Sequence, residues 1–176
     1  MEIVVVTDSK LAASWVRRCE EKHPVLREVS TLVWRGAELS VLVEGETPLS
    51  YNVTYYGKRK KNIWEPYANW YTAYTVLANR RQGLAKRLAE ASRKEAVRRG
   101  CRRIKSLAGT MLGVRLHESF GDLFWGIKDT LEVVVDSPLV PMKEYALKRP
   151  PTSLAEIMTA EEVIRQLADR KLRYDQ

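Results

Sequence analysis

The chain contains few cysteines and histidines, with two of each among 176 residues. Cys19 and Cys101 lie far apart and share no disulfide framework or metal-ligand spacing, so the sequence predicts reduced, buried thiols in a cytoplasmic protein. His23 and His117 are not grouped with cysteines or carboxylates either. We therefore expect no metal site.

Long apolar runs are also absent. No stretch approaches the ~18 residues that a transmembrane helix needs. The first eight residues lack the basic opening and apolar centre of a secretory signal, so we expect neither a membrane span nor an exported precursor. The composition, 45% apolar and 30% charged, is that of a folded protein rather than a disordered one. A chain of this length can form one domain with a substantial core.

Positive charge, in contrast, is abundant, and the net charge is +8. A basic surface suits nucleic acid, an anionic cofactor with several phosphates, or an acidic partner protein. No zinc-finger, helix-turn-helix or RNA-binding string accompanies the charge, so we do not expect nucleic acid. Two features leave alternatives open: the aromatic cluster at 64–71 can line a pocket or the core, and the basic loop at 57–62 can bind an anion or only face solvent.

The stretch from Tyr74 to Leu88 organises the chain, because it has the pattern of a strand, a short basic turn and the start of a helix. Such a turn directs unpaired backbone N–H groups and the positive end of the helix dipole to one point, which attracts phosphate. Gly83 lets a diphosphate approach the main chain, and the small Ala85 leaves the first helical turn open. The basic residues around the turn are Arg80, Arg81, Lys86 and Arg87.

The turn has the sequence Arg80-Arg81-Gln82-Gly83-Leu84-Ala85. This string resembles the Gln/Arg-x-x-Gly-x-Gly/Ala motif of the GCN5-related N-acetyltransferases (GNAT), the acyl-coenzyme A pyrophosphate loop of that family. Further along, the segment from Leu116 to Gly121 is similar to the family's Leu-Tyr-x-x-x-Gly-Phe segment. The resemblance covers residues 70–126 by motif, and the rest of the chain only by the order of its elements.

The resemblance implies an α+β fold, the acyl-CoA N-acyltransferase fold, with a mostly antiparallel mixed sheet, a central splayed pair of parallel strands and flanking helices. It also implies acetyl-CoA, or another acyl-CoA, as cofactor, with its pantetheine arm between the splayed strands. The acceptor would be an amine of a small molecule or of a protein. The implied cofactor-binding residues are Val76, Leu77, Arg80, Arg81, Gln82, Gly83, Leu84 and Ala85.

Periodicity and turn signals predict the elements themselves. The motif strand is expected at 71–78, the following helix at 83–99 and the next strand at 104–108. The two strands should pair in parallel, because a strand, a helix and a strand make a right-handed crossover. Other strands are expected at 2–7, 38–44, 49–56, 124–127 and 131–135, and other helices at 9–23 and 114–120, whereas 25–35 can be helical or irregular.

We expect one domain over residues 1–148 and a helical C-terminal extension over 149–176. Capping boxes at 153–156 and 159–162 predict two short helices or one broken helix in this extension. Its apolar face is formed by Val163, Ile164, Leu167 and Leu172. That face can pack on the domain or bind another protein, and a homodimer is a further alternative.

The family's usual proton donor to the leaving thiolate is a Tyr on the short helix after the second motif strand. His117 occupies that place here; a histidine can donate a proton near neutral pH, although a polar histidine on a helix is also commonly structural. The Asn expected upstream of that helix is absent at 109–110. The motif strand has no carboxylate, so the general base would be Glu65, Tyr71 or Tyr74 acting through water.

These departures leave two hypotheses. In the first, the protein is an acyl-CoA-dependent N-acyltransferase that uses His117 as proton donor. In the second, it keeps the fold and the cofactor site but has weak or no catalysis and modulates a partner protein, for example as a phage-type modulator of a host enzyme. Fold alone does not decide between them, since one scaffold can serve several functions.

Overall fold

Eight strands form one mixed sheet in a computed structural model that describes residues 1–19, 26–57, 67–107, 109–128, 132–139 and 150–174. The strands are β1 (Glu2–Val6), β2 (Glu38–Glu44), β3 (Thr47–Tyr56), β4 (Tyr67–Thr75), β5 (Arg103–Leu107), β6 (Leu123–Ile127), β7 (Val133–Pro138) and β8 (Ala155–Met158). The helices are α1 (Ser9–Cys19), α2 (Leu26–Trp34), the 3-10 turn η1 (Leu77–Asn79), α3 (Leu84–Arg98), α4 (Met111–Glu118) and α6 (Ala160–Tyr174).

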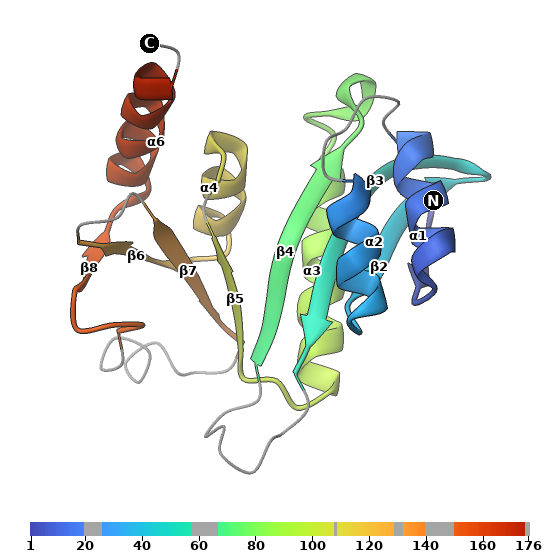
Figure 1. The fold of residues 1–176 in the computed structure, drawn as a ribbon, viewed down its shortest axis with the longest axis horizontal. Coiled ribbons are helices and arrows are strands. Elements are labelled where there is room, and N and C mark those ends of the chain that lie inside the picture. The colour runs from blue at the N-terminus through green and yellow to red at the C-terminus, as the bar shows by residue number, and fades with distance from the viewer. Residues whose placement is uncertain (20–25, 58–66, 108, 129–131, 140–149, 175–176) are drawn as a thin grey trace.

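The order of strands across the sheet is β1-β2-β3-β4-β5-β7-β6-β8, and Figure 1 shows it as two arms joined where β4 meets β5. Every other described pair of neighbouring strands is antiparallel, whereas β4 and β5 are parallel. The predicted α+β fold with a central parallel pair is therefore confirmed. Since α3 connects the two strands, the crossover prediction is confirmed as well.

The parallel pairing is short. It extends from Tyr67 opposite Arg103 to Asn69 opposite Lys105, and beyond that point the two strands diverge (Figure 1). On its other side, β4 continues to pair with β3, but the register shifts so that Tyr71 is an extra residue on β4. Such a bulge bends a strand and increases its twist. The bulge therefore gives a physical reason for the separation of β4 from β5.

Helices cover both faces of the β1–β4 arm. Along β2, the side chains of Leu39, Val41 and Val43 join a core formed with α1 and α2, whereas Leu42 points to the other face and packs against α3. The strand is consequently buried on both faces rather than on one. Because both faces of β2 are buried, residues 39–43 are all apolar except Ser40.

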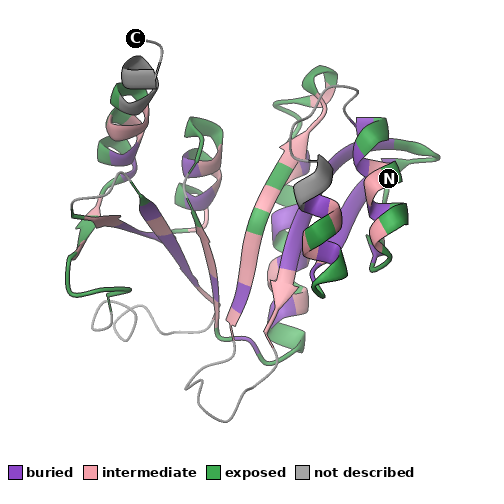
Figure 2. Cartoon of the chain, in the orientation of Figure 1, coloured by how far each residue is buried: buried purple, intermediate pink, exposed green. Residues whose placement is uncertain are grey.

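The two central strands are less buried than the strands beside them. β2 and β3 are buried over most of their length, whereas β4 alternates between intermediate and exposed residues after Ala68 (Figure 2). On β5, Leu107 leaves 64% of its surface exposed. A strand in the middle of a sheet is ordinarily well covered, so this exposure sets the diverging parts of β4 and β5 apart from the rest of the sheet.

The C-terminal segment contributes a strand as well as a helix. The prediction of a helix at 153–156 is wrong, because β8 pairs antiparallel with β6 and forms one edge of the sheet. The second capping box is confirmed: the Thr159 hydroxyl accepts from the Glu162 N–H, and the Glu162 carboxylate accepts from the Thr159 N–H. That N–H also lowers the pKa of Glu162.

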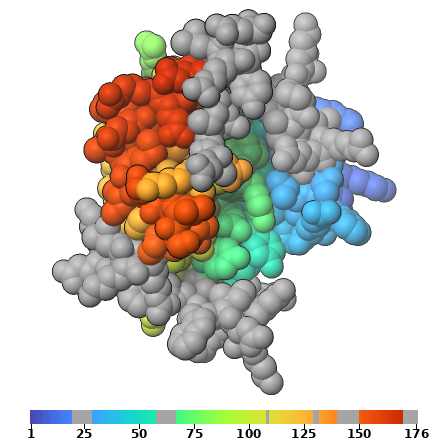
Figure 3. Space-filling model, turned by 60° about the vertical axis from the view of Figure 1, so that its left-hand side comes forward, coloured from blue at the N-terminus to red at the C-terminus, as the bar shows by residue number. Residues whose placement is uncertain are grey.

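Helix α6 packs on the same sheet. Val163 is fully buried with Phe124, Val133 and Val135, and Ile164 and Leu167 pack against the same cluster. In the space-filling view the C-terminal residues, in red, lie against those of β6 and β7 in orange (Figure 3). Of the two alternatives for this apolar face, packing on the domain or binding another protein, these three residues follow the first. Leu172 lies outside the residues whose side chains the structure describes.

Two predicted boundaries are also wrong. The motif strand ends at Thr75 rather than at 78, because residues 77–79 form η1. The short helix begins at Met111 rather than at 114, because the Thr110 hydroxyl accepts from the Gly113 N–H and caps it there. The segment at 25–35, which by sequence can be helical or irregular, contains the helix α2.

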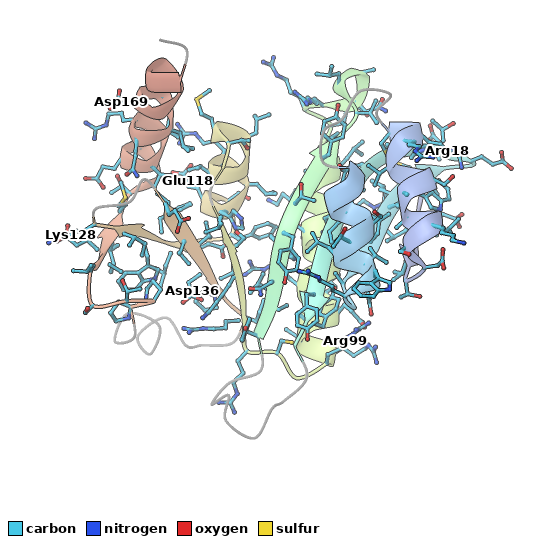
Figure 4. The ribbon with its side chains drawn as sticks, viewed as in Figure 1. Arg18, Arg99, Glu118, Lys128, Asp136 and Asp169 are labelled. Atoms are coloured by element: carbon cyan, nitrogen blue, oxygen red, sulfur yellow. The ribbon has the colours of Figure 1, made fainter. Side chains whose placement is uncertain are left out.

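A network of ion pairs fixes the C-terminal end of α3. Arg99, labelled in Figure 4, binds Glu38 on β2 with Nη1 to Oε1 at 2.7 Å and also binds Glu95 on its own helix at 2.6 Å. Arg98 binds the same Glu95 carboxylate. This network ties the crossover helix to β2 at the end opposite to the motif turn. None of the described helices is long and apolar enough to span a membrane.

Candidate functional site

The central feature of the site is the point at which β4 and β5 separate, which we call the fork. The first residues beyond the parallel pairing are Trp70 on β4 and Ser106 on β5, each directly after the last parallel pair. Because β4 runs away from the fork into the turn that precedes α3, the N-terminus of α3 lies at the open end of the two strands. The part of β4 that lies beyond its pairing with β5, which we call the open stretch of β4, therefore runs from the fork toward the start of α3.

The turn at residues 80–85 has an open, strained main chain. Gly83 is left-handed with φ 75° and ψ 7°, and a Cβ added there would meet nothing within 4 Å. Arg81 has φ 65° and is the one non-glycine residue with positive φ among those the structure describes. That conformation costs an L-residue roughly 1–2 kcal/mol, so the turn is held in a shape that its local sequence does not prefer.

No described side chain caps α3, and its first turn has no acidic residue. In contrast, Asp8 accepts from the Leu11 N–H at the start of α1, and Thr110 caps α4. The first N–H groups of α3 and the positive end of its dipole therefore face outward from an exposed turn. An anion is the complement of such a helix start.

The basic residues near this turn differ in their contacts. Arg80 donates to the Thr75 carbonyl at 3.2 Å and lies over the Tyr74 ring at 5.5 Å, so it is folded back on the end of β4. Arg87 donates to the Met1 carbonyl at 3.3 Å. Arg81 and Gln82 are exposed beside Gly83. Positive charge thus surrounds the turn without closing it.

Two residues that the motif implied as cofactor contacts, Leu84 and Val76, have other structural roles, and a third, Leu77, is exposed. Leu84 is buried and packs with Leu42 and Leu88, so that only its main chain can serve a ligand. The Val76 N–H donates to the Leu49 carbonyl at 3.0 Å, and its side chain packs against the α1 and α2 core. Leu77 has 69% of its surface exposed.

His117 lies at the fork and is buried, with 5% of its surface exposed. Its Nε2 is 2.9 Å from the Ser106 Oγ, and its Nδ1 is 2.7 Å from the Asp122 Oδ2. Its ring lies 5.5 Å from the Trp70 ring, centroid to centroid. The histidine therefore contacts Ser106 and Trp70, the first residue of each strand beyond the β4–β5 pairing, and α4 positions it there.

Asp122 anchors this arrangement from the other side. Its side chain is fully buried, and its Oδ1 accepts from the Arg93 Nη1 at 3.1 Å. Arg93 projects from α3, so the contact joins α3, α4 and the start of β6. Arg93 also lies over the Phe120 ring at 4.6 Å. Both oxygens of this buried carboxylate thus have a hydrogen-bond partner.

The structure brings some of the predicted catalytic residues to the fork and not others. Tyr74 packs its ring at 5.9 Å from the buried Tyr51, on the α1 and α2 side of the sheet. Trp70, which contacts His117, instead packs with Ala96 on the α3 side. Tyr74 and His117 therefore approach from opposite faces. Glu65 lies outside the described residues.

The sequence patterns did not indicate Ser106 and Asp122 as site residues. One signal was available: Ser106 stands inside an apolar strand of the motif region. Asp122 directly follows the Gly of a segment that resembles the family, but nothing local indicated that it would fold back five residues to His117. Among the described residues, no group of three or more His, Cys, Asp and Glu could hold a metal ion.

No protein-family model matches the chain, and no curated protein matches it. Among solved structures, the chain is similar to the ribosomal-protein-S18-alanine N-acetyltransferase from Escherichia coli, with 13% identity, 78% of this chain and 94% of that chain covered, and a TM-score of 0.60. An acetyltransferase assigned to the GNAT family from Desulfovibrio desulfuricans matches with 12% identity, 79% and 100% coverage, and a TM-score of 0.59.

A chain of the NatC complex, in a structure bound to a Gag peptide and CoA, matches with 15% identity, coverage of 80% of this chain and 100% of that chain, and a TM-score of 0.59. At such low identity these likenesses establish the architecture alone. The chain has the GNAT acyl-CoA N-acyltransferase fold, as the resemblance of residues 80–85 implied.

Proposed function

We propose that the protein is an acyl-CoA-dependent N-acyltransferase that transfers an acyl group from the CoA thioester to an amine. The acyl group in this proposal is acetyl. The observation that carries the proposal is the fork: β4 and β5 separate toward the same end of the sheet at which α3 presents its uncapped N-terminus.

The open stretch of β4 fits the pantetheine arm. Six residues, 70–75, follow the fork on β4, which at ~3.3 Å per residue gives roughly 20 Å of strand. Pantetheine is an extended chain with two amide groups, and a strand edge offers main-chain N–H and C=O groups to such a chain. Bound in this way, the arm would run from the α3 turn to the fork and bring the thioester next to His117.

The α3 turn fits the pyrophosphate. Its N–H groups from Gly83 to Ala85, together with the exposed Arg81 and Gln82, would surround the two phosphates, and the absence of a Cβ at Gly83 leaves space for them. Arg80 would act from its position over Tyr74. Val76 and Leu77 would line the beginning of the arm, although the Val76 N–H is already engaged.

The chemistry would use His117 as the acid–base group at the fork. A proton must leave the amine and another must reach the CoA thiolate, and groups placed for such transfers contribute roughly 10²–10⁴-fold. For direct transfer of the acyl group to the amine, Tyr74, from the opposite face, and Glu65 remain the proposed routes for the proton of the amine. The amine would belong to a small molecule or to a protein.

We also propose a cytoplasmic location, which two buried cysteines outside any disulfide, Cys19 and Cys101, support. The division into a domain at 1–148 and an extension at 149–176 remains a proposal, with β8 and α6 packed on the sheet.

A partner protein or a second copy would meet the chain at the β8 edge, where Leu154 and Ile157 are each about half exposed.

The proposal is tested by calorimetry with acetyl-CoA and by thiol release with a panel of amines. We expect binding of one acetyl-CoA per chain and thiol release that depends on the added amine. Binding without turnover on any amine would favour the binding-module hypothesis. Failure to bind acetyl-CoA and longer acyl-CoAs would contradict both hypotheses.

A further inference from the structure

Ser106, His117 and Asp122 form a chain of hydrogen bonds at the fork, which we call the fork triad. Ser106 Oγ is 2.9 Å from His117 Nε2, and His117 Nδ1 is 2.7 Å from Asp122 Oδ2. A hydroxyl, an imidazole and a carboxylate in this order and at these distances make the arrangement that activates a serine as a nucleophile. The motif of residues 80–85 does not account for it.

The partners of Asp122 fix where the protons lie. The Asp122 carboxylate also accepts from Arg93, and an ionised carboxylate can only accept hydrogen bonds. When the imidazole of His117 carries a single proton, that proton therefore lies on Nδ1 and is donated to Asp122. This leaves the lone pair of Nε2 directed at Ser106, whose O–H donates to it. The imidazole is thus in the tautomer that a general base requires.

The three residues of the fork triad differ in burial in a way that suits these roles. Asp122 and His117 are buried, whereas Ser106 is only partly buried and the next residue, Leu107, is largely exposed. Side chains of α4 and β4 occupy part of the space between the diverging strands (Figure 4). The base and the residue that orients it are thus shielded from water, and the hydroxyl stands at the side from which a ligand between the strands would arrive.

We propose that Ser106 accepts the acyl group of the donor before the amine does, so that the reaction passes through an O-acyl-serine. This inference rests on the proposed function for its donor. Ser106 Oγ bonds to the thioester carbonyl carbon while His117 Nε2 takes the hydroxyl proton. The C–S bond then breaks, and the proton passes from His117 to the thiolate, which leaves as free CoA.

The second half-reaction regenerates the serine. The amine nitrogen attacks the ester carbon of the O-acyl-serine, His117 takes a proton from the nitrogen, and the bond from carbon to Ser106 Oγ breaks. His117 then returns the proton to Oγ. Acyl transfer is complete without any further reactant, and both half-reactions use the same base.

The indole Nε1–H of Trp70 is the candidate donor for the developing oxyanion. This N–H is buried and has no hydrogen-bond partner among the described residues. The Trp70 ring lies against His117, at the first residue of β4 beyond the pairing. A buried N–H without a partner is costly in the resting protein, and a charge that forms on the thioester oxygen at the fork would give it one. Donors of this kind contribute roughly 10²–10³-fold to acyl transfer.

The first test is the intact mass of the protein after incubation with acetyl-CoA and no amine. We expect one added acetyl group per chain, mapped to Ser106 by peptide sequencing, with a burst of thiol release equal to the protein concentration. Ser106→Ala should give neither and should lower amine-dependent turnover by about 10³-fold or more. Ser106→Cys should restore a covalent acyl-protein, now as a thioester.

A second test does not depend on acyl-CoA. A fluorophosphonate probe bonds to an activated serine oxygen with loss of fluoride, whatever the natural donor is. We expect it to label Ser106 in the parent protein and the rate of labelling to fall at least tenfold in His117→Gln. A surface serine, Ser119, is the internal reference and should stay unlabelled.

The outcomes separate the two proposals. Turnover in the parent with no acyl-protein, no labelling and full activity in Ser106→Ala would mean direct transfer to the amine and would overturn the inference while leaving the proposed function intact. Labelling of Ser106 without any binding of acyl-CoA would support the nucleophile and contradict the CoA-dependent function. Absence of both labelling and acyl-CoA turnover would contradict both.

The oxyanion donor has a matched control. Trp70→Phe keeps the ring against His117 but removes the N–H, and it should slow acylation by at least tenfold with little change in acetyl-CoA affinity. Trp125 on β6 also has a buried Nε1–H without a described partner, but it lies outside the fork. Trp125→Phe should leave acylation unchanged. Equal effects of the two variants would assign Trp70 a structural role only.

Discussion

Gly83 and Gly100 stand at opposite ends of α3 in nearly the same left-handed conformation, with φ of 75° and 78°. A Cβ added at either position would meet nothing within 4 Å. They differ in their electrostatic surroundings, because Gly83 precedes the positive end of the helix dipole and Gly100 follows the negative end. The two glycines therefore allow the anion site to be tested against a control with the same backbone requirement.

Gly83→Glu should abolish detectable acetyl-CoA binding in calorimetry, because the carboxylate would occupy the place of the pyrophosphate next to the first N–H groups of α3. Gly100→Glu carries the same left-handed strain of roughly 1 kcal/mol but should bind acetyl-CoA as the parent does. Of the two variants, Gly83→Glu should nevertheless have the larger free energy of unfolding, since a negative charge stabilises a helix start and destabilises a helix end. Equal affinities in the two variants would rule out the α3 turn as the phosphate site.

Asp122→Asn should lower the free energy of unfolding by about 2–4 kcal/mol in urea titrations. The carboxylate is fully buried and binds both Arg93 and His117, and the amide would leave the Arg93 charge, 17% exposed, without its counter-charge. In the same variant His117 could take the other tautomer, so acyl transfer should fall as well.

The control for this change is Glu118→Gln. Glu118 pairs with Arg115 at 2.9 Å, but both side chains are about half exposed, and such surface pairs contribute roughly 0–1 kcal/mol. A stability loss for Asp122→Asn as small as that for Glu118→Gln would show that the triad is not held together in solution as the structure describes.

Local signals were sufficient for much of the fold. The parallel pairing of β4 with β5 and the helix that connects them were predicted, because an apolar strand, a Gly turn and an amphipathic helix each leave a pattern within a short window. The capping box at Thr159 was predicted for the same reason. These features depend on residues that are near one another in sequence.

The features that the sequence could not predict depend on distant partners. Nothing in the string around Tyr71 signals a bulge, which arises from the register between β3 and β4. The Ser-x-x-Glu pattern at 153–156 fits a capping box and predicts a helix, whereas the pairing of β8 with β6 decides the conformation. The role of His117 likewise depended on Ser106, eleven residues away, and on Asp122 across the end of α4.

Glu95→Gln should change stability in a pH-dependent way. Hydrogen bonds from Arg98 and then Arg99 lower the pKa of Glu95 from its ordinary 4.5 to about 2. A depressed carboxyl pKa stabilises the folded state above pH 4.5, and that contribution is lost as the pH falls toward 2. The variant should therefore be less stable than the parent by about 0.5–1 kcal/mol at pH 7, and the difference should vanish near pH 2. A difference independent of pH would exclude this ionisation as its cause.

Val163→Ala should lower the free energy of unfolding of the whole protein by about 2 kcal/mol, because it removes two buried methyl groups from the contact of α6 with the sheet. For a chain of this size the melting temperature should fall by about 4–8 °C. Val97→Ala is the control: Val97 lies on α3 with 48% of its surface exposed, and its replacement should change the free energy by less than about 0.5 kcal/mol. Because β8 and α6 belong to the same sheet and core, Val163→Ala should keep a single unfolding transition by calorimetry. An unchanged midpoint, or a separate low-temperature transition, would mean that the segment after residue 149 is attached to the domain only loosely.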